Sequence, residues 1–447
     1  MIEWINKRLE EFENDEALIV NGKIYLYSDI LKGVDRWTNK LKSDSIHKKE
    51  VVALFGDFSA EMLFALLALA INENIILPIA SEKEDKLNDM LNVARADKLY
   101  IFDDANVKLK ELSNTSTHPL LEKLRVENDA GIMIFTSGST GEGKCALHRF
   151  SSLTYKSKKE VKRRALRTLV FLKMDHIGGI NTIFSILFQG GTMVLINDRT
   201  IKTVCSSIEK YKVQLLPTTP SFINMMIISG ACKNYDLSSL MLITYGTEVM
   251  PITTLKAINE EMPYVKIRQT YGLTEMGIFS TKSKDNSSLW MKVGGDGVET
   301  KIKNNILFIR SPYAMLGYLN ASSPFDDEGW YNTGDEVRMD GEYLHILGRK
   351  EEIINVGGEK VFPAEIENVL LRMSNVQDVV VYGKKSPITG QIVVAEFCLI
   401  NNEDEKLFKK RVLQYAKGHL EPYKIPRIIT ISNKNFIGSN LKKKRFI

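Results

Sequence analysis

The sequence predicts an α/β protein with a large N-terminal domain of parallel and mixed sheets with helices, including a small antiparallel β subdomain, followed by a small α+β domain. Three observations predict this arrangement. Strand-like apolar runs alternate with helix-period segments through most of the chain, which is typical of parallel sheets whose strands are joined by helices. Near residue 300 the runs become short and are separated by Gly, Asn and Asp, as in antiparallel strands joined by turns. The 447 residues exceed the length of one ordinary domain, which is about 100–200 residues.

The strands of the large domain are predicted from apolar runs that end in turn residues. In order, the chain shows VVALFG at 51–56, a helix-like segment at 59–72 and NIILPIA at 74–80. Four further runs have the same character: AGIMIFTSGST, GGTMVLIN, VQLLPTTP and LMLITYGTE, at 130–140, 190–197, 213–220 and 240–248. This order of strand, helix and strand favours largely parallel sheets.

The last third of the chain has a different pattern. KIKNNILFIRSP at 301–312 and GEYLHILGRK at 341–350 predict short antiparallel strands. A compact α+β pattern then follows, with helix-like segments at 363–373 and 405–420 and strand-like segments at 376–384 and 392–400. We therefore predict an N-terminal domain of residues 1–347, a boundary at 348–352 and a second domain of residues 353–447.

The composition is that of a globular protein, with 44% hydrophobic and 26% charged residues. A net charge of +5 tolerates anionic ligands and does not indicate nucleic acid as a partner. Four scattered cysteines without a C-x-x-C pair argue against a zinc site or a disulfide framework and suit a reducing compartment. The longest apolar stretch, residues 62–71, is far shorter than the ~20 residues of a transmembrane helix. We therefore expect a cytoplasmic protein without a membrane span.

The segment FTSGSTGEGKC, residues 135–145, has the residues of a phosphate-binding loop. Backbone N–H groups around Ser137, Gly138, Ser139 and Thr140 can surround an anion, and Gly141 and Gly143 permit the backbone angles that this requires. Lys144 adds a positive charge. A Walker loop would continue with Ser or Thr, whereas this chain has Cys145, which suits Mg²⁺ poorly. The alternative is a surface loop that binds no ligand.

Two later segments offer further polar groups. In QTYGLTEMG, residues 269–277, Tyr271 offers a flat face for a base, and Thr274 and Glu275 offer oxygens for a hard cation. In the segment 329–367, Asp335 can accept hydrogen bonds from two ribose hydroxyls and Arg349 suits a phosphate or ribose contact. Gly357 and Gly358 in the same segment allow a ligand to pass close to the backbone. Each of these residues also has a structural alternative, as a turn residue, an ion-pair partner or a hairpin glycine.

In this order and spacing, TSGSTGEGK, YGLTE, YNTGD and GRKEEIINVGGEKVFPAEIE resemble the motifs of the adenylate-forming (ANL) superfamily of acyl-CoA synthetases, carrier-loading adenylation domains and luciferases. The resemblance implies two half-reactions: a carboxylate attacks the α-phosphate of ATP, and a thiol of coenzyme A or of a carrier's phosphopantetheine then takes the acyl group. It also implies Mg²⁺ at Glu275 and a small C-terminal domain that rotates about Glu351. The implied nucleotide and cofactor contacts are Thr136, Ser137, Gly138, Ser139, Thr140, Gly141, Lys144, Tyr245, Gly246, Thr247, Tyr271, Gly272, Asp335, Arg349, Glu351, Gly357 and Gly358.

For the acyl pocket, the resemblance points to KMDHIGGI, where His176 occupies the position of a residue that follows the substrate into its pocket. A histidine at a helix start is the structural alternative. Asp175 could meet a substrate amine, as in relatives that activate amino acids. TYGTEVMP, residues 244–251, resembles the segment that lines the pocket and the adenine edge. It does not indicate which acid is the substrate.

The C-terminus departs from the family pattern. A gapless count from YKIP places the catalytic lysine of the family at Lys442, whereas matching GSN to the family's SG places Leu441 in that position. We expect Lys442. The basic segment 155–167 suits docking of an acidic carrier protein or coenzyme A phosphates, or forms a solvated helix face.

These features leave three hypotheses. The first is an acyl- or aryl-CoA ligase, and the second is an enzyme that loads an acyl or amino acid onto a carrier protein. The third is a nucleotide- or acyl-binding homologue that has lost adenylation, which the irregular C-terminus motivates.

Overall fold

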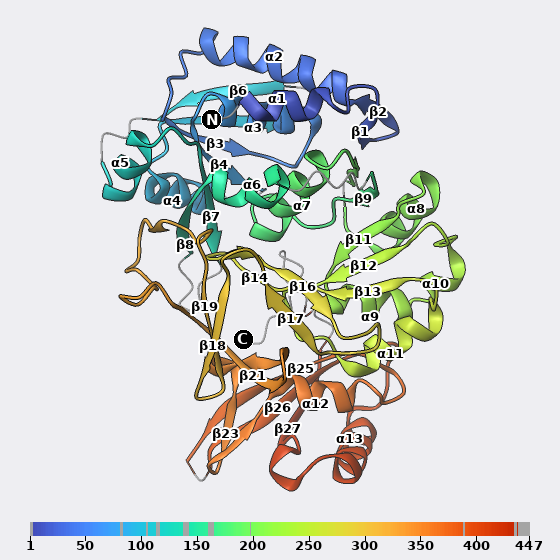
Figure 1. Cartoon of the computed structure of the whole chain (residues 1–447). Coiled ribbons are helices and arrows are strands. Elements are labelled where there is room, and N and C mark those ends of the chain that lie inside the picture. Colours follow the sequence, from blue (N-terminus) through green and yellow to red (C-terminus); the bar gives the residue numbers. More distant parts are fainter. Residues whose placement is uncertain are drawn as a thin grey trace.

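The computed structural model describes residues 3–80, 84–103, 106–112, 117–136, 143–159, 165–196, 198–387, 389–432 and 436. Within these residues, the N-terminal part is built on two seven-stranded sheets, which we call sheets I and II. The structure confirms the predicted architecture of mixed sheets with helices, an antiparallel subdomain and a small C-terminal α+β part (Figure 1).

Sheet I has the strand order β20-β8-β7-β4-β3-β5-β6. The pairs β3–β4, β3–β5 and β4–β7 are parallel, whereas β5–β6, β7–β8 and β8–β20 are antiparallel. The bounds are β3 (Val51–Phe55), β4 (Ile75–Ile79), β5 (Lys98–Asp103), β6 (Asn106–Glu111), β7 (Gly131–Thr136), β8 (Lys144–Arg149) and β20 (Gly317–Tyr318).

Sheet II has the order β13-β12-β11-β9-β10-β1-β2. All neighbouring pairs are parallel except β1–β2. The bounds are β1 (Glu16–Val20), β2 (Lys23–Leu26), β9 (Arg167–Leu169), β10 (Thr192–Val194), β11 (Leu215–Thr218), β12 (Leu242–Tyr245) and β13 (Lys266–Gln269). Each of the predicted segments at 51–56, 74–80, 130–140, 190–197, 213–220 and 240–248 contains a described strand of these two sheets.

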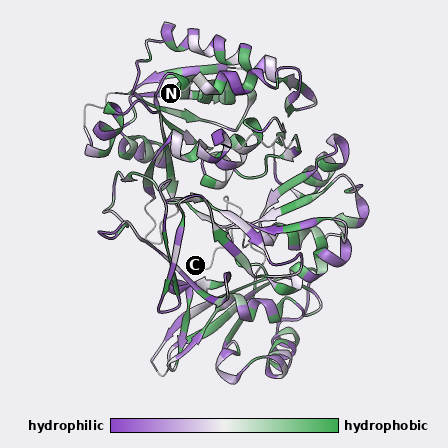
Figure 2. Ribbon diagram, viewed as in Figure 1, coloured by the Kyte–Doolittle hydropathy of each residue, from purple (hydrophilic) through white to green (hydrophobic). Residues whose placement is uncertain are grey.

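Helices cover both faces of the sheets. Their bounds are α1 (Glu3–Glu10), α2 (Tyr27–Ser43), α3 (Ala60–Ile71), α4 (Glu84–Ala94), α5 (Pro119–Val126), α6 (Phe150–Lys159), α7 (Ile177–Leu187), α8 (Ile201–Tyr211), α9 (Pro220–Ile228), α10 (Ala231–Asn234) and α11 (Ile252–Glu261). Surface helices such as α2 alternate hydrophilic and hydrophobic residues, whereas strands β11 and β12 are mostly hydrophobic (Figure 2). This is the pattern that a buried sheet under amphipathic helices requires.

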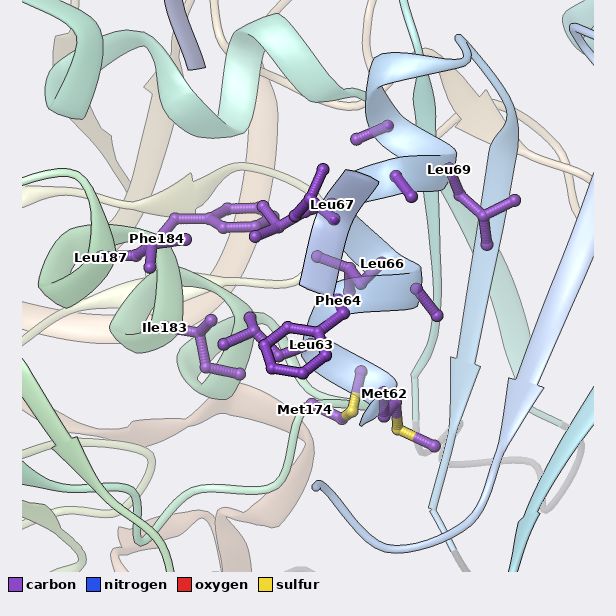
Figure 3. Packing of buried hydrophobic residues seen from close by; sticks show 14 of the residues in the cluster. Met62, Leu63, Phe64, Leu66, Leu67, Leu69, Met174, Ile183, Phe184 and Leu187 are labelled. Atoms are coloured by element: carbon purple, nitrogen blue, oxygen red, sulfur yellow. The ribbon is translucent and has the colours of Figure 1, made fainter. Parts of the chain in front are cut away.

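The largest core cluster joins the two sheets through α3 and α7. It contains residues of β3, β4 and β7 from sheet I together with residues of β1 and β10 from sheet II. Helix α3 is apolar on all sides and is buried along most of its length. Its Leu63 and Leu67 point toward Ile183 and Phe184 of α7 (Figure 3). These contacts fix the position of α7, which carries the candidate substrate residues described below.

The antiparallel subdomain is sheet III, with the order β16-β17-β22-β21-β19-β18. The predicted hairpin at 301–312 is present, because Asn304 and Asn305 take φ values of 53° and 62° in the two-residue turn between β18 and β19. The bounds are β16 (Ser280–Ser283), β17 (Met291–Gly294), β18 (Glu299–Lys303), β19 (Ile306–Arg310), β21 (Tyr331–Asp340) and β22 (Tyr343–Arg349). The short pair β14 (Gly272–Leu273) and β15 (Gly277–Ile278) precedes this sheet.

A short 3-10 helix, η1 (Lys350–Glu352), follows β22 and leads to the C-terminal sheet, sheet IV, at the bottom of Figure 1. Sheet IV has the order β24-β23-β26-β25, with β27 on β26, and has its own core cluster. The bounds are β23 (Ile354–Val356), β24 (Glu359–Val361), α12 (Pro363–Leu370), β25 (Val376–Ser386), β26 (Gly390–Leu399), α13 (Glu405–His419), η2 (Pro422–Lys424) and β27 (Ile428–Ile431). In the described part of the chain, no helix has the length and apolar character that crossing a membrane requires.

Candidate active site

A cavity of about 1120 Å³ lies where sheets I, II and III meet. Sheet II contributes the carboxyl ends of its parallel strands β11, β12 and β13, the edge at which open α/β sheets usually bind ligands. The predicted site residues that line the cavity are Thr136, Lys144, His176, Gly246, Thr247, Gly272, Thr274, Glu275, Arg349 and Glu351. Segments that are far apart in the sequence therefore meet at one site.

The predicted phosphate loop connects two antiparallel strands. Thr136 at the end of β7 pairs with Lys144 at the start of β8. A Walker loop runs from a strand into a helix, so this connection is of a different kind. Asn320 fixes the base of the hairpin, because its side chain donates to the Gly143 carbonyl and accepts from the Cys145 N–H, each over 2.9 Å.

The two ends of the hairpin line the cavity, whereas the neighbouring Cys145 is buried in the core. Thr136 and Lys144 line the cavity, and Lys144 Nζ lies 5.4 Å from the centre of the Tyr318 ring. The Cys145 side chain is fully buried in the core of sheet I, and burial raises the pKa of its thiol. Cys145 is therefore a core residue and does not face the nucleotide site. The predicted contacts Ser137, Gly138, Ser139, Thr140 and Gly141 lie outside the described residues.

Tyr271, Asp335 and Arg349 form one connected cluster. The Tyr271 hydroxyl donates to Asp335 Oδ2 over 2.5 Å, and Arg349 Nε lies 3.7 Å from Asp335 Oδ1. Asp335 and Arg349 are directly opposite each other on β21 and β22. Burial raises the pKa of Asp335, whereas the Arg349 charge and the Tyr271 hydrogen bond oppose that shift. The cluster therefore favours an ionised Asp335 at a position that is only 6% exposed.

The ring of Tyr271 is itself largely buried. It is 8% exposed and lies nearly parallel to Phe279, with ring centres 6.0 Å apart. Burial and the charge of Asp335 raise the pKa of the Tyr271 phenol, so it remains a proton donor. The predicted stacking of Tyr271 on adenine stays a prediction, and the structure adds a second role, the orientation of Asp335.

Glu275 lines the cavity and is 9% exposed. The Tyr318 hydroxyl donates to Glu275 Oε1, and burial together with the Glu275 charge raises the pKa of that phenol. The same two causes raise the pKa of Tyr331, which also lines the cavity. Two phenols near one carboxylate keep it oriented toward the cavity.

The chemistry of this site fits one Mg²⁺ that is held mainly by its substrate. Mg²⁺ is usually bound by one or two carboxylates, substrate phosphates and water. Glu275 supplies one such carboxylate, and no group of three or more His, Cys, Asp or Glu within the described ranges could hold a metal by itself. The described residues therefore do not form a metal site without the phosphates of a substrate.

The segments around Gly246 and Gly272 bring the backbone close to the cavity. A Cβ atom at Gly246 would lie 2.6 Å from Thr270 Oγ1, and one at Gly272 would lie 2.4 Å from Ile278 Cδ1. Thr247 takes a φ of +71°, which is uncommon for a residue with a side chain. Tyr245 is 1% exposed and its ring belongs to the core of sheet II, so its side chain does not line the cavity.

His176 is the residue that precedes α7, and it lines the cavity with a half-exposed side chain. Its Nε2 lies 3.7 Å from Asp175 Oδ1, and Asp175 Oδ2 accepts from the Ala80 N–H over 3.3 Å. Asp175 is not among the cavity residues, which leaves the suggested contact with a substrate amine without structural support. Gly179 allows this loop to pack on α7, because a Cβ there would lie 1.8 Å from the Lys173 carbonyl oxygen.

Two further groups of predicted residues are not placed at the cavity by the described part of the structure. Gly357 and Gly358 form the β23–β24 turn, with φ values of +63° and +94°, and do not line the cavity. Lys442 and Leu441, the two candidates for the catalytic lysine position, lie outside the described residues. Their roles therefore stay predictions.

The described part of the basic segment 155–167 is engaged within the protein. Lys156 Nζ donates to the Ile278 carbonyl over 2.7 Å, and Lys159 pairs with Asp296. Lys158 Nζ lies 5.9 Å from the Trp4 ring centre. These contacts favour a structural role for the lysines of α6.

Four residues at or beside the site were missed by the sequence reasoning. Tyr318 and Asn320 lie in the segment LGYLN, which none of the motifs covers, and Arg268 lines the cavity from the end of β13. Tyr331 stands in the YNTGD motif but was not singled out.

An α/β fold with a large cavity at the carboxyl ends of parallel strands is typical of enzymes that bind a nucleotide or a similar ligand. The chain belongs to the AMP-binding enzyme family: the profile of that family matches residues 5–319, and the profile of the AMP-binding enzyme C-terminal domain matches residues 365–435. This confirms the family resemblance that the motifs predicted.

Curated relatives cover nearly the whole chain. The indoleacetate–CoA ligase of Aromatoleum aromaticum is 28% identical over 95% of this chain and 92% of its own. The 2-succinylbenzoate–CoA ligase of Listeria innocua is 25% identical over 96% of this chain and 95% of its own. Family and relatives confirm the predicted class of enzyme, an AMP-forming ligase that joins a carboxylic acid to a thiol.

Solved structures share the fold. The anthranilate CoA ligase AuaEII in complex with anthranoyl-AMP superposes with a TM-score of 0.85 at 20% identity, covering 99% of this chain and 95% of its own. The o-succinylbenzoate CoA synthetase of Bacillus subtilis, in complex with its acyl-adenylate intermediate, gives 0.80 at 22% identity, covering 99% and 96%.

Proposed function

We propose that this protein is an acyl- or aryl-CoA ligase that forms acyl-AMP and pyrophosphate from an acid and ATP, and then transfers the acyl group to coenzyme A. The observation that carries the proposal is the shared cavity, which brings the ends of the phosphate hairpin, Glu275, Arg349 and His176 together. CoA ligases among the relatives support coenzyme A as the acceptor.

In the first half-reaction, an oxygen of the substrate carboxylate forms a bond to the α-phosphorus, and the bond between that phosphorus and the bridging oxygen breaks to release pyrophosphate. The protein's task is positioning and charge neutralisation. Thr136 and Lys144 hold phosphate oxygens, and Thr274 contacts the phosphate at the reacting end. Glu275, oriented by Tyr318, holds Mg²⁺, which neutralises phosphate charge when bound.

The ribose is held by Asp335, whose carboxylate accepts from the two hydroxyls, while Tyr271 and Arg349 stabilise its charged form against the effect of burial. Gly246, Thr247 and Gly272 line the cavity, where they contact the nucleotide. Lys442 supplies the cation that bridges the carboxylate and the α-phosphate.

For the second half-reaction, we propose that the chain pivots at η1 near Glu351, between sheets III and IV, so that 348–352 is the domain boundary. The present arrangement includes an ion pair of 3.2 Å between Lys360 and Glu336 and a 3.4 Å hydrogen bond from Asn224 to the Gln377 carbonyl. A rotation breaks these two contacts and brings the Gly357–Gly358 turn toward the cavity, where it can pass the thin pantetheine arm. A cytoplasmic location, with its ATP and coenzyme A, belongs to the same proposal.

The experiment that tests this function incubates the protein with ATP, Mg²⁺ and a panel of aryl, fatty and amino acids, and measures AMP and acyl-CoA by mass spectrometry. Glu275→Gln is the impaired variant, and Glu299→Gln, on the surface of sheet III, is the matched control. We expect acid-dependent AMP and acyl-CoA in the wild type and in Glu299→Gln, and formation about 10²–10³-fold slower in Glu275→Gln. Acyl transfer to a holo-carrier protein but not to coenzyme A would favour the carrier-loading alternative, and no AMP with any acid would favour a binding protein.

A further inference from the structure

Helix α7 presents a polar face to the cavity. Its apolar residues Ile180, Ile183, Phe184 and Leu187 are buried in the core between the sheets, three of them visible in Figure 3. The residues that line the cavity from this segment recur at helical spacing and are small or polar: Gly178, Asn181, Thr182, Ser185 and Gln189, with Ile177 and Ile186 at the margins. In a surface helix such a polar face meets solvent. Here it forms a wall of the substrate cavity.

Most of these polar groups have no hydrogen-bond partner among the residues that the structure describes. Thr182 Oγ1 donates to the Gly178 carbonyl over 2.7 Å. The side chains of Asn181, Ser185 and Gln189 make no hydrogen bond with the residues that the structure describes. Covering such groups with an apolar ligand would cost free energy, because they would lose water and gain no hydrogen bond.

Sheet II provides another wall of the cavity. Pro217, Thr244 and Arg268 are register neighbours across β11, β12 and β13, and all three line the cavity. The alternation of β13 explains why Arg268 points there: Ile267 and Gln269, on either side of it, are buried on the opposite face of the strand. A guanidinium group thus lies in a wall that also contains hydroxyl and apolar groups and the carboxylate of Glu248, which accepts a hydrogen bond from the Ser221 hydroxyl over 2.7 Å.

Arg268 differs from the other cations of the cavity. Lys156 donates to the Ile278 carbonyl, Arg349 lies 3.7 Å from both Asp335 and Glu351, and Lys144 belongs to the phosphate hairpin. For Arg268, the described residues provide no hydrogen bond and no ion pair to its side chain. A free guanidinium in a ligand cavity is matched best by a carboxylate, which it can bind through two parallel hydrogen bonds.

We propose that the acid activated by this protein carries a second carboxylate, and that Arg268 binds it while the polar face of α7 accommodates its oxygens. This inference rests on the proposed function, since it concerns the substrate of the same reaction. Arg268 is a specificity-determining residue in this scheme: one carboxylate is adenylated at the Glu275 end and the other pairs with the guanidinium.

The test compares dicarboxylic acids with the monocarboxylic acids that lack the second group. Succinate, adipate and terephthalate are paired with butyrate, hexanoate and benzoate, and kcat/KM is measured by acid-dependent ATP–pyrophosphate exchange. The variants are Arg268→Gln and, as a matched control on the same strand, the exposed Lys266→Gln. Thermal unfolding of each variant verifies that it is folded.

We expect the wild type and Lys266→Gln to prefer at least one diacid over its monoacid partner. In Arg268→Gln, kcat/KM for that diacid should fall about 10- to 100-fold, with the monoacid changed by less than about 2-fold. Exchange with monoacids and no Arg268-dependent preference would overturn this inference and leave the proposed function intact. Loss of ATP affinity with every acid in Arg268→Gln would also overturn it and assign Arg268 to the nucleotide. If calorimetry shows that a diacid binds only when Arg268 is present, but the wild type catalyses no exchange, the diacid pocket would stand. The proposed function would then be overturned instead.

Discussion

Replacing Tyr271 by Phe removes one hydroxyl from the site and keeps the aromatic ring. The hydroxyl lies 2.5 Å from Asp335 Oδ2, and Asp335 is only 6% exposed, so water cannot readily take the place of the lost donor. A hydrogen bond to a charged group contributes about 1.5–3 kcal/mol. If Asp335 holds the ribose, we expect kcat/KM for ATP to fall about 10- to 100-fold in Tyr271→Phe. In the proposed scheme the acid is bound by other residues, so its KM should change little.

The same substitution has a predicted effect on pH dependence. Burial raises the pKa of Asp335, while Arg349 and the Tyr271 hydroxyl lower it. Asp335 accepts the ribose hydroxyls in its ionised form, so ATP binding is present above this pKa and is lost as the pH falls through it. Removing the Tyr271 donor raises the pKa of Asp335 further. The acidic limb of kcat/KM for ATP should therefore move to higher pH.

The assay is acid-dependent ATP–pyrophosphate exchange at varied ATP concentration and pH, on wild type, Tyr271→Phe, Tyr271→Leu and the exposed control Tyr264→Phe. Phe retains a face for adenine and Leu does not, so a larger loss in Tyr271→Leu measures the stacking contribution separately. An unchanged dependence on ATP together with an unmoved acidic limb in a folded Tyr271→Phe protein would refute the proposed role of the hydroxyl.

Three other substitutions give distinct expectations. Glu275→Gln should lower kcat for adenylation about 10²–10³-fold and raise the Mg²⁺ concentration needed for half-maximal rate, which a Mg²⁺ titration measures. An unchanged Mg²⁺ dependence would show that Glu275 does not bind the metal. Leu66→Ala, at a fully buried position of α3, should reduce the free energy of unfolding by about 2–5 kcal/mol in urea titrations, whereas a loss below about 1 kcal/mol would contradict tight packing between the sheets. Cys145→Ala should lower stability by about 1 kcal/mol and leave the Mg²⁺ dependence unchanged, since the thiol is buried in the core of sheet I. A changed Mg²⁺ dependence there would place Cys145 at the metal after all.

The strands of the large domain could be predicted because they are short apolar runs between turn residues. VVALFG and NIILPIA became the adjacent parallel strands β3 and β4, with most of their residues buried. The Asn-Asn turn between β18 and β19 was equally readable, because few residues accept positive φ at two successive positions. Strand β8 was less accessible from sequence, since KCALHR mixes charges with apolar residues and follows a loop that resembles a strand-to-helix connection.

The site was predicted only where a motif carries its chemistry. Glu275, Asp335 and Arg349 were found in motifs, whereas Tyr318 reaches Glu275 across 43 residues of sequence and left no local signal. From sequence alone, the polar face of α7 resembles the solvent-exposed face of a surface helix. Helical spacing cannot show whether that face borders bulk water or a cavity. Arg268 was missed for the same reason: its position in the cavity depends on the register of three strands.

Acid-dependent ATP–pyrophosphate exchange in wild type, Lys442→Ala and Lys443→Ala tests the central claim most directly. We expect exchange with at least one acid in the wild type and in Lys443→Ala, and a collapse in Lys442→Ala, because adenylation needs a cation between the carboxylate and the α-phosphate. If exchange persists in Lys442→Ala, another residue supplies that cation. No exchange with any acid in the wild type, despite ATP binding, would contradict the assignment of this cavity to acyl-adenylate formation.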